Sequence, residues 1–177
     1  MNNRPQDYAM QSFYWTDAWA KIDGLDLMPI QRKLVLPPPE GAGLSAETVA
    51  LSILWYRRFL KVCAKFPENR SVPNRLIDEV WHAHILDTRK YSADCFSIFN
   101  RMLHHFPYFG LNDDADVRDK CFEVTDQLYI QEFGESIKSI LVTTPNEPGG
   151  DANLRATVCD STACTSACKG SSENYVF

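Results

Sequence analysis

The chain has 177 residues, of which 45% are hydrophobic, and it carries a formal net charge of −5. This length and apolar content fit one ordinary domain with a buried core. The acidic balance argues against a nucleic-acid partner, since binding phosphates requires clustered Lys and Arg. The sequence has neither the apolar run of a signal peptide nor the roughly 18 apolar residues of a membrane span, so it predicts a cytoplasmic protein without a membrane partner.

Residues 1–44 are predicted to form a helix and an extended arm that pack on the rest of the chain. The aromatic stretch at residues 8–20 favours a short helix. Residues 24–44 contain Pro29, three consecutive prolines at 37–39 and a Gly-Ala-Gly sequence, all of which interrupt regular structure. We therefore expect an arm here, without helical structure.

Residues 45–142 are predicted to form a helical, His-rich domain. Ser45 is a suitable N-cap for a first helix that ends before Pro67. Pro73 and Asn74 announce a second helix. The apolar side chains of these two helices recur at helical spacing, at Val49, Ile53, Tyr56, Leu60 and Cys63 in the first and at Ile77, Val80, Trp81 and His84 in the second.

Two further helices and a short helical piece complete this prediction. Asp87 is placed to cap a third helix that continues to about His104, and Asp113 and Asp114 to cap a fourth, which Gly134 interrupts. The fourth helix has an apolar stripe of Val117, Cys121, Val124 and Leu128. The predicted fold class is all-α: a compact bundle of about five helices with a disordered C-terminal tail.

Residues 143–177 form the predicted tail. They are rich in Ser, Thr, Ala, Gly and Asn, lack a hydrophobic period and carry Cys159, Cys164 and Cys168. Such a segment buries too little apolar surface to offset its ordering entropy. We expect a flexible tail with three thiols.

All four histidines fall between residues 82 and 105, and this clustering is the main indication of chemistry. His84 lies in the apolar stripe of the second helix. At 100° per residue, Asp87, Tyr91, Asp94 and His105 share one face of the third helix, and Cys95 borders it. If this face packs on His84, then His84 and His105 with Asp94 or Cys95 form a zinc-type ligand set.

The remaining polar residues of this region have supporting roles in that prediction. Asp87 or Tyr91 would hydrogen-bond to the metal-ligating side chains and so orient them. His82 faces the polar side of its helix with Asp78 and Glu79 and is an alternative ligand or a surface ion-pair partner. His104 is an alternative ligand or a cation at the end of the third helix. The competing interpretation is that His84 is a core histidine that hydrogen-bonds to a carboxylate or carbonyl, with no metal.

The segments VPNRLIDEVWHAHILDTRKYSADC and LHHFPYFG resemble the signature of the glycine-rich domain-containing protein-like family. The stretches LDLMPIQRKLV and WYRRFLKVCAKFPENRSVP also match, so the resemblance covers about residues 24–136. It implies an all-α domain. Plant members of that family are multidomain proteins with Gly-rich tails, whereas this tail carries three cysteines, and the chain is more similar to a short bacterial member.

Three functions fit these patterns. The first is a non-catalytic, metal-binding interaction module with a cysteine-bearing tail, for which zinc is the expected ion and a protein the expected partner. The second is a ribosomal peptide precursor, in which a folded leader presents a Cys/Ser/Thr-rich core to a tail-modifying enzyme. The third is a metal-dependent enzyme with His82 or His105 as general base.

Overall fold

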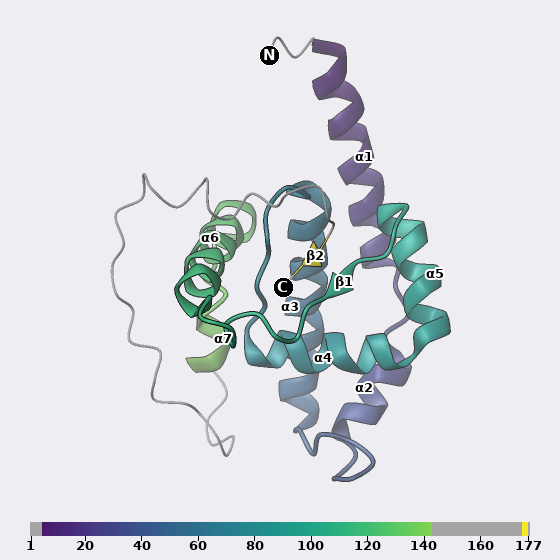
Figure 1. Cartoon of the computed structure of the whole chain (residues 1–177). Coiled ribbons are helices and arrows are strands. Elements are labelled where there is room, and N and C mark those ends of the chain that lie inside the picture. Colours follow the sequence, from purple (N-terminus) through teal and green to yellow (C-terminus); the bar gives the residue numbers. More distant parts are fainter. Residues whose placement is uncertain (1–4, 143–174, 177) are drawn as a thin grey trace.

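The computed structural model describes the backbone of residues 5–142 and 175–176 and the side chains of residues 14–140. These residues are mostly helical, as the sequence predicts (Figure 1). The helices are α1 (Pro5–Asp23), α2 (Met28–Val35), α3 (Ala46–Lys65), α4 (Arg75–Leu86), α5 (Thr88–Phe99), α6 (Ala115–Phe133) and α7 (Ser139–Val142). Two short strands, β1 (His104–His105) and β2 (Tyr175–Val176), pair in parallel.

Helix α3 is the central element of the core. It packs against α1, α2, α4 and α6, and Tyr56 and Phe59 on its buried side are fully excluded from solvent. Its start is the predicted one, because the Ser45 hydroxyl accepts a hydrogen bond from the Thr48 amide at 3.1 Å. The predicted apolar stripe also holds, with Ile53 partly buried and the other four residues buried.

The prediction of an extended arm over residues 24–44 is wrong, because α2 lies within it. Pro29 occupies the first turn of this helix. Backbone N–H groups in the first turn make no hydrogen bond within the helix, so the missing N–H of proline costs nothing there and the proline can start the helix. Ile30 and Leu34 of α2 and Ile22 of α1 join the same hydrophobic core as α3. The N-terminal helices therefore contribute to the main core.

Helix α4 begins as predicted. The Asn74 side chain accepts a hydrogen bond from the Ile77 amide at 3.0 Å and donates one to the Ile137 carbonyl at 2.8 Å. Trp81 and His84 point inward, with 0% and 2% exposure, whereas the side chain of His82 is 47% exposed. The orientations predicted for these residues are confirmed.

Helix α5 starts as predicted but ends earlier. The Asp87 carboxylate accepts a hydrogen bond from the Lys90 amide at 3.3 Å. At the other end, Asn100 adopts the left-handed conformation with φ 56° and stops the helix after Phe99. His104 and His105 consequently lie in extended backbone, in β1, and the prediction that the helix reaches His104 is wrong.

The last part of the described domain is α6 with α7. Asp114 precedes α6, but its carboxylate accepts hydrogen bonds from the Gly110 and Asn112 amides rather than from the helix. Gly134 ends α6 with φ 72°, at the predicted position. The stripe of α6 has Cys121 buried and Val117, Val124 and Leu128 partly buried.

The predicted tail thiols Cys159, Cys164 and Cys168 lie outside the described residues, as does the rest of the tail apart from β2. In the part of the chain that the structure describes, no helix has the length and apolar character required to cross a membrane.

Candidate metal site

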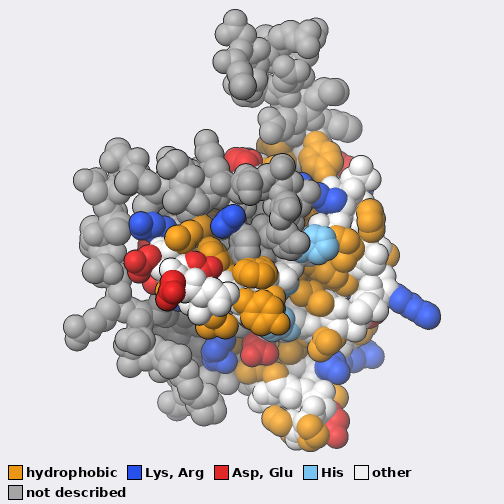
Figure 2. Space-filling model, viewed as in Figure 1, with side chains coloured by type: hydrophobic (Ala, Val, Ile, Leu, Met, Phe, Trp, Pro, Cys, Tyr) orange, Lys and Arg blue, Asp and Glu red, His pale blue; other side chains and the backbone are white. Residues whose placement is uncertain are grey.

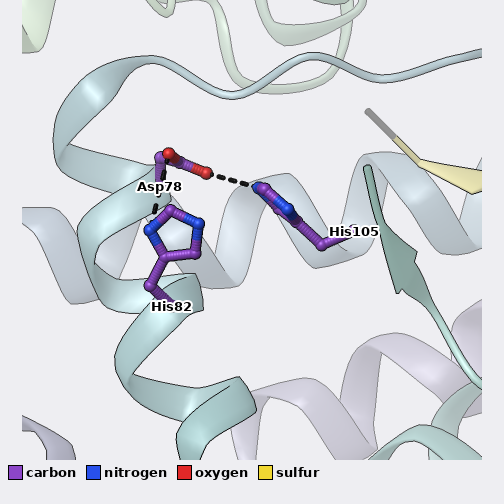
Figure 3. A group of neighbouring side chains, drawn as sticks. All are labelled: Asp78, His82 and His105. Atoms are coloured by element: carbon purple, nitrogen blue, oxygen red, sulfur yellow. Dashed lines mark hydrogen bonds and ion pairs between the residues drawn. The ribbon is translucent and has the colours of Figure 1, made fainter. Parts of the chain in front are cut away.

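Three side chains from two elements converge at one edge of α4. Asp78 and His82 lie one turn apart on α4 and so project from the same face of that helix. His105 reaches toward them from β1 (Figure 3). Each residue offers one ligand atom, and these three atoms lie within 4.8 Å of one another. We refer to Asp78, His82 and His105 as the convergent triad.

Asp78 is the centre of the convergent triad. One carboxylate oxygen, Oδ1, lies 2.9 Å from Nε2 of His105, and the other, Oδ2, lies 3.7 Å from Nδ1 of His82. The imidazole rings of His82 and His105 are 4.7 Å apart between centroids. One carboxylate therefore contacts both imidazole rings, each through a different oxygen.

The triad lies at the boundary between core and solvent. The ring of His105 packs edge-on against the buried Trp81 at 4.7 Å, and only 11% of its side chain is exposed. The side chains of Asp78 and His82 are 32% and 47% exposed. Histidine atoms reach the surface on the face seen in Figure 2. Asp78 and His82 are thus open to solvent, whereas His105 lies on the buried side of the triad.

The position of β1 depends on a chain of buried hydrogen bonds. The Trp81 indole donates to the hydroxyl of Tyr91 at 2.9 Å, and that hydroxyl donates to the Leu103 carbonyl. Leu103 directly precedes β1 and is itself buried. Tyr91 thereby fastens the start of β1 to α4 and α5, which places His105 opposite Asp78.

His84 belongs to a different group of side chains, the buried polar network of Tyr56, His84, Asp94 and Lys90. Nδ1 of His84 lies 2.9 Å from the Tyr56 hydroxyl, and Nε2 lies 3.0 Å from Asp94. Lys90 donates to the same Asp94 oxygen at 2.8 Å. Because a carboxylate only accepts, Nε2 of His84 carries the proton and Nδ1 accepts from Tyr56.

The charge state of His84 agrees with this tautomer. Burial lowers the pKa of His84, against the opposing effect of Asp94, and so favours the neutral ring. Both ring nitrogens then have partners, which leaves neither of them for an ion. The structure supports the core-histidine interpretation of His84.

The ligand set of His84, His105, Asp94 and Cys95 is not assembled. Among residues 14–140, the group whose ligand atoms converge is the triad, which includes only His105 of the four. Burial raises the pKa of the Cys95 thiol and so disfavours the thiolate that zinc requires. The helical face predicted to hold both Asp94 and His105 does not exist, because α5 ends at Phe99 and His105 lies beyond it in β1.

Asp87, Tyr91 and His104, which were expected to support or replace the ligands, also lie elsewhere. Asp87 is an exposed helix cap, Tyr91 orients β1, and His104 is an exposed residue of β1 rather than the end of a helix. His82, the predicted alternative, is in the triad. Sequence reasoning missed Asp78 as a ligand, although its spacing of four residues from His82 is a visible signal.

A family model described as UCP032817-like matches residues 39–132. The match spans more than half of the chain and contains the convergent triad and the buried polar network, so the chain belongs to this family. The resemblance noted in the sequence is supported at this coarser level, without the glycine-rich description. Neither the curated proteins nor the solved structures contain a match to the chain.

Proposed function

We propose that the protein is a non-catalytic metal-binding module that holds one divalent ion, zinc, at the convergent triad. The observation that carries this proposal is the convergence of Asp78, His82 and His105 from two separate elements. Two imidazole nitrogens and one carboxylate oxygen form a ligand set that suits zinc. The metal would join β1 to α4.

The spacing of the ligand atoms supports this proposal. In a tetrahedral site with bond lengths near 2.0–2.1 Å, neighbouring ligand atoms are about 3.3 Å apart. The two oxygens of Asp78 lie 2.9 Å from His105 and 3.7 Å from His82, and the three ligand atoms, one from each residue, lie within 4.8 Å of one another. Side-chain rotations that bring the ligand atoms closer together by up to about 1.5 Å would accommodate the ion.

The proton on His105 has to leave when the ion binds. The hydrogen bond between His105 and Asp78 requires a proton between Nε2 and the carboxylate, and the ion would take its place. Metal ligands bind in their deprotonated forms, so zinc binding would release protons and weaken as the pH falls. At a free zinc concentration of ~100 times the dissociation constant, binding would stabilise the fold by about 2.7 kcal/mol.

The experiment is a calorimetric zinc titration of the full chain and four single variants. Asp78→Asn, His82→Ala and His105→Ala each remove one ligand and are expected to weaken binding at least about tenfold, which corresponds to about 1.4 kcal/mol. His104→Ala is the matched control, since His104 is the neighbouring exposed residue on β1. Absence of zinc binding by the parent chain, or equal losses in the control, would reject the proposal.

A metal-dependent enzyme is a second candidate, favoured by the number of ligands. Three protein ligands leave a coordination position open, as in catalytic zinc sites. Cobalt substitution followed by azide addition distinguishes the two functions. A shift in the visible spectrum would show an exchangeable position and favour the enzyme, and an unchanged spectrum would favour a closed site.

The tail, the cellular location and the detailed family description are further proposals, each with its own support. The tail cysteines Cys159, Cys164 and Cys168 offer a fourth ligand or a contact for a protein partner. The peptide-precursor function rests on the composition of residues 143–177. A cytoplasmic location is supported by the buried cysteines Cys63 and Cys95, which form no disulfide among the described residues. The glycine-rich family description is supported by the motif between residues 72 and 110.

A further inference from the structure

The strand that supplies His105 is paired with the C-terminal segment of the chain. Tyr175 lies opposite His104, and Val176 lies opposite His105, in a parallel arrangement. Figure 1 shows β2 beside β1, far along the sequence from the helices around it. A segment more than 30 residues beyond α7 thus returns to the convergent triad.

Strand β1 is suited to receive an extended segment. Extended backbone presents N–H and C=O groups sideways, and these groups need partners from a neighbouring strand or from water. Addition of a peptide strand to such an edge is a common mode of recognition, in which backbone hydrogen bonds supply affinity. A strand of two residues has few such bonds, so its geometry depends strongly on what lies beside it.

We propose that β1 is an acceptor strand for the C-terminal segment around Tyr175–Val176 and that docking of this segment is coupled to metal binding at the convergent triad. The coupling rests on the proposed metal function. His105 is the shared residue, because its backbone pairs with Val176 and its side chain faces Asp78. Whatever holds β1 extended also holds the His105 imidazole at the triad.

Docking of β2 and binding of the ion are expected to strengthen each other, because both act on β1. Leu103 is fastened by Tyr91, but β1 beyond it is held by β2 on one side and by the side-chain contacts of His105 on the other. Docking of β2 orders His105 before the ion arrives, and the ion orders β1 before β2 docks. By linkage, each event strengthens the other by the same factor.

The test compares the parent chain with the double variant Tyr175→Pro/Val176→Pro, which cannot donate backbone hydrogen bonds from β2. Ser171→Pro is the matched control outside the strand. Amide exchange at Val176 is measured by NMR with zinc and with chelator, in the parent chain and in the control. In both, zinc is expected to slow the exchange about fivefold or more relative to chelator. The zinc affinity of the double variant is expected to fall by the same factor, and that of the control to stay unchanged.

A peptide of residues 171–177 added to a chain truncated at residue 170 provides the second measurement. The peptide is expected to restore the zinc affinity that truncation lowers, since β1 is the acceptor in either case. Zinc affinities that are equal in the parent and the double variant would overturn the coupling while leaving the metal site intact. A parent chain that binds no zinc would instead overturn the proposed function, and the coupling with it.

Discussion

His84 and His105 show how neighbouring groups decide the chemistry of a histidine. His84 is enclosed, with Tyr56 on one ring nitrogen and Asp94 on the other. His105 has a carboxylate on Nε2 and a second imidazole beside it, close to solvent. The first arrangement fixes a neutral ring within the core, whereas the second leaves two imidazoles and a carboxylate grouped near solvent.

The buried position of His84 predicts a dependence of stability on pH. Burial lowers its pKa in the folded state, so as the pH falls below the unfolded value of about 6.5 the unfolded chain binds the proton first. The free energy of unfolding should therefore decrease as the pH falls through this window and be insensitive to His84 above it. Urea unfolding between pH 5 and 8 measures the slope.

The matched variant for this prediction is His84→Gln, which has no titrating ring. Its slope should be smaller than that of the parent chain below about pH 6.5, even though its stability is lower at all pH values. Titratable groups that do not contact His84 contribute equally to both chains, so the difference between the two slopes reports His84 together with its partner Asp94. Identical slopes would contradict the assignment of a neutral, buried ring.

At the scale of elements, the hydroxyl of Tyr91 connects the core to β1. Tyr91→Phe leaves the Trp81 indole and the Leu103 carbonyl without their partner, at an expected cost of about 2–3 kcal/mol in the free energy of unfolding. It should also weaken zinc binding, because β1 loses its attachment. Unfolding and zinc titrations on the same preparation measure both effects.

Tyr56→Phe is the control for Tyr91→Phe. It removes a buried hydroxyl of the same kind, but from the network of His84, whose hydrogen bonds run to Tyr56 and Asp94 rather than to β1. It should therefore lower stability by a similar amount while the zinc affinity stays unchanged. Equal effects on zinc affinity in the two variants would show that Tyr91 acts only through general stability.

The helices whose bounds the sequence predicts correctly begin or end at capping residues. Ser45, Asn74 and Asp87 cap helices through their own side chains, and Gly134 ends α6 by adopting a positive φ. These effects depend on the nearest few residues, so the sequence contains them. Helix α2 was missed because Pro29 both starts helices and interrupts them, and its neighbours along the chain do not decide between the two.

The candidate site was predictable only in part. The clustering of histidines pointed to the correct region, and the spacing of Asp78 and His82 is readable on one helix. The contribution of His105 depends on the end of α5 at Asn100 and on the attachment of Leu103 to Tyr91. The first is a local left-handed cap that the sequence prediction overlooked, and the second is set by tertiary packing, which a helical projection of the sequence does not include.

For the whole molecule, the N-terminal helices close one side of the core. Ile22 and Leu27 are buried in it, and the ring of Trp19 stacks on Phe133 of α6 at 5.9 Å. The Trp19 indole also donates to the Lys61 carbonyl at 3.1 Å. These contacts join α1 to both α3 and α6.

Deletion of residues 1–27 is therefore expected to destabilise the protein severely. Loss of the burial of Ile22 and Leu27 alone removes about 3–6 kcal/mol, a large part of the 5–15 kcal/mol that typically stabilises a domain. Urea unfolding followed by circular dichroism measures the change. Deletion of residues 146–177 is the control and should leave the helices folded, and a stable fragment lacking residues 1–27 would contradict this account.

The contact between Trp81 and His105 gives the protein an optical reporter of its own. Their ring centroids are 4.7 Å apart, so a change of charge on the imidazole is felt directly by the excited indole. Addition of zinc should alter the tryptophan emission, and Trp81→Phe should abolish the response while Trp15, Trp19 and Trp55 continue to emit. An emission change that persists in Trp81→Phe would place the responding indole elsewhere. The emission of Trp81, which packs against His105, would then report zinc binding at the triad in real time and without a label.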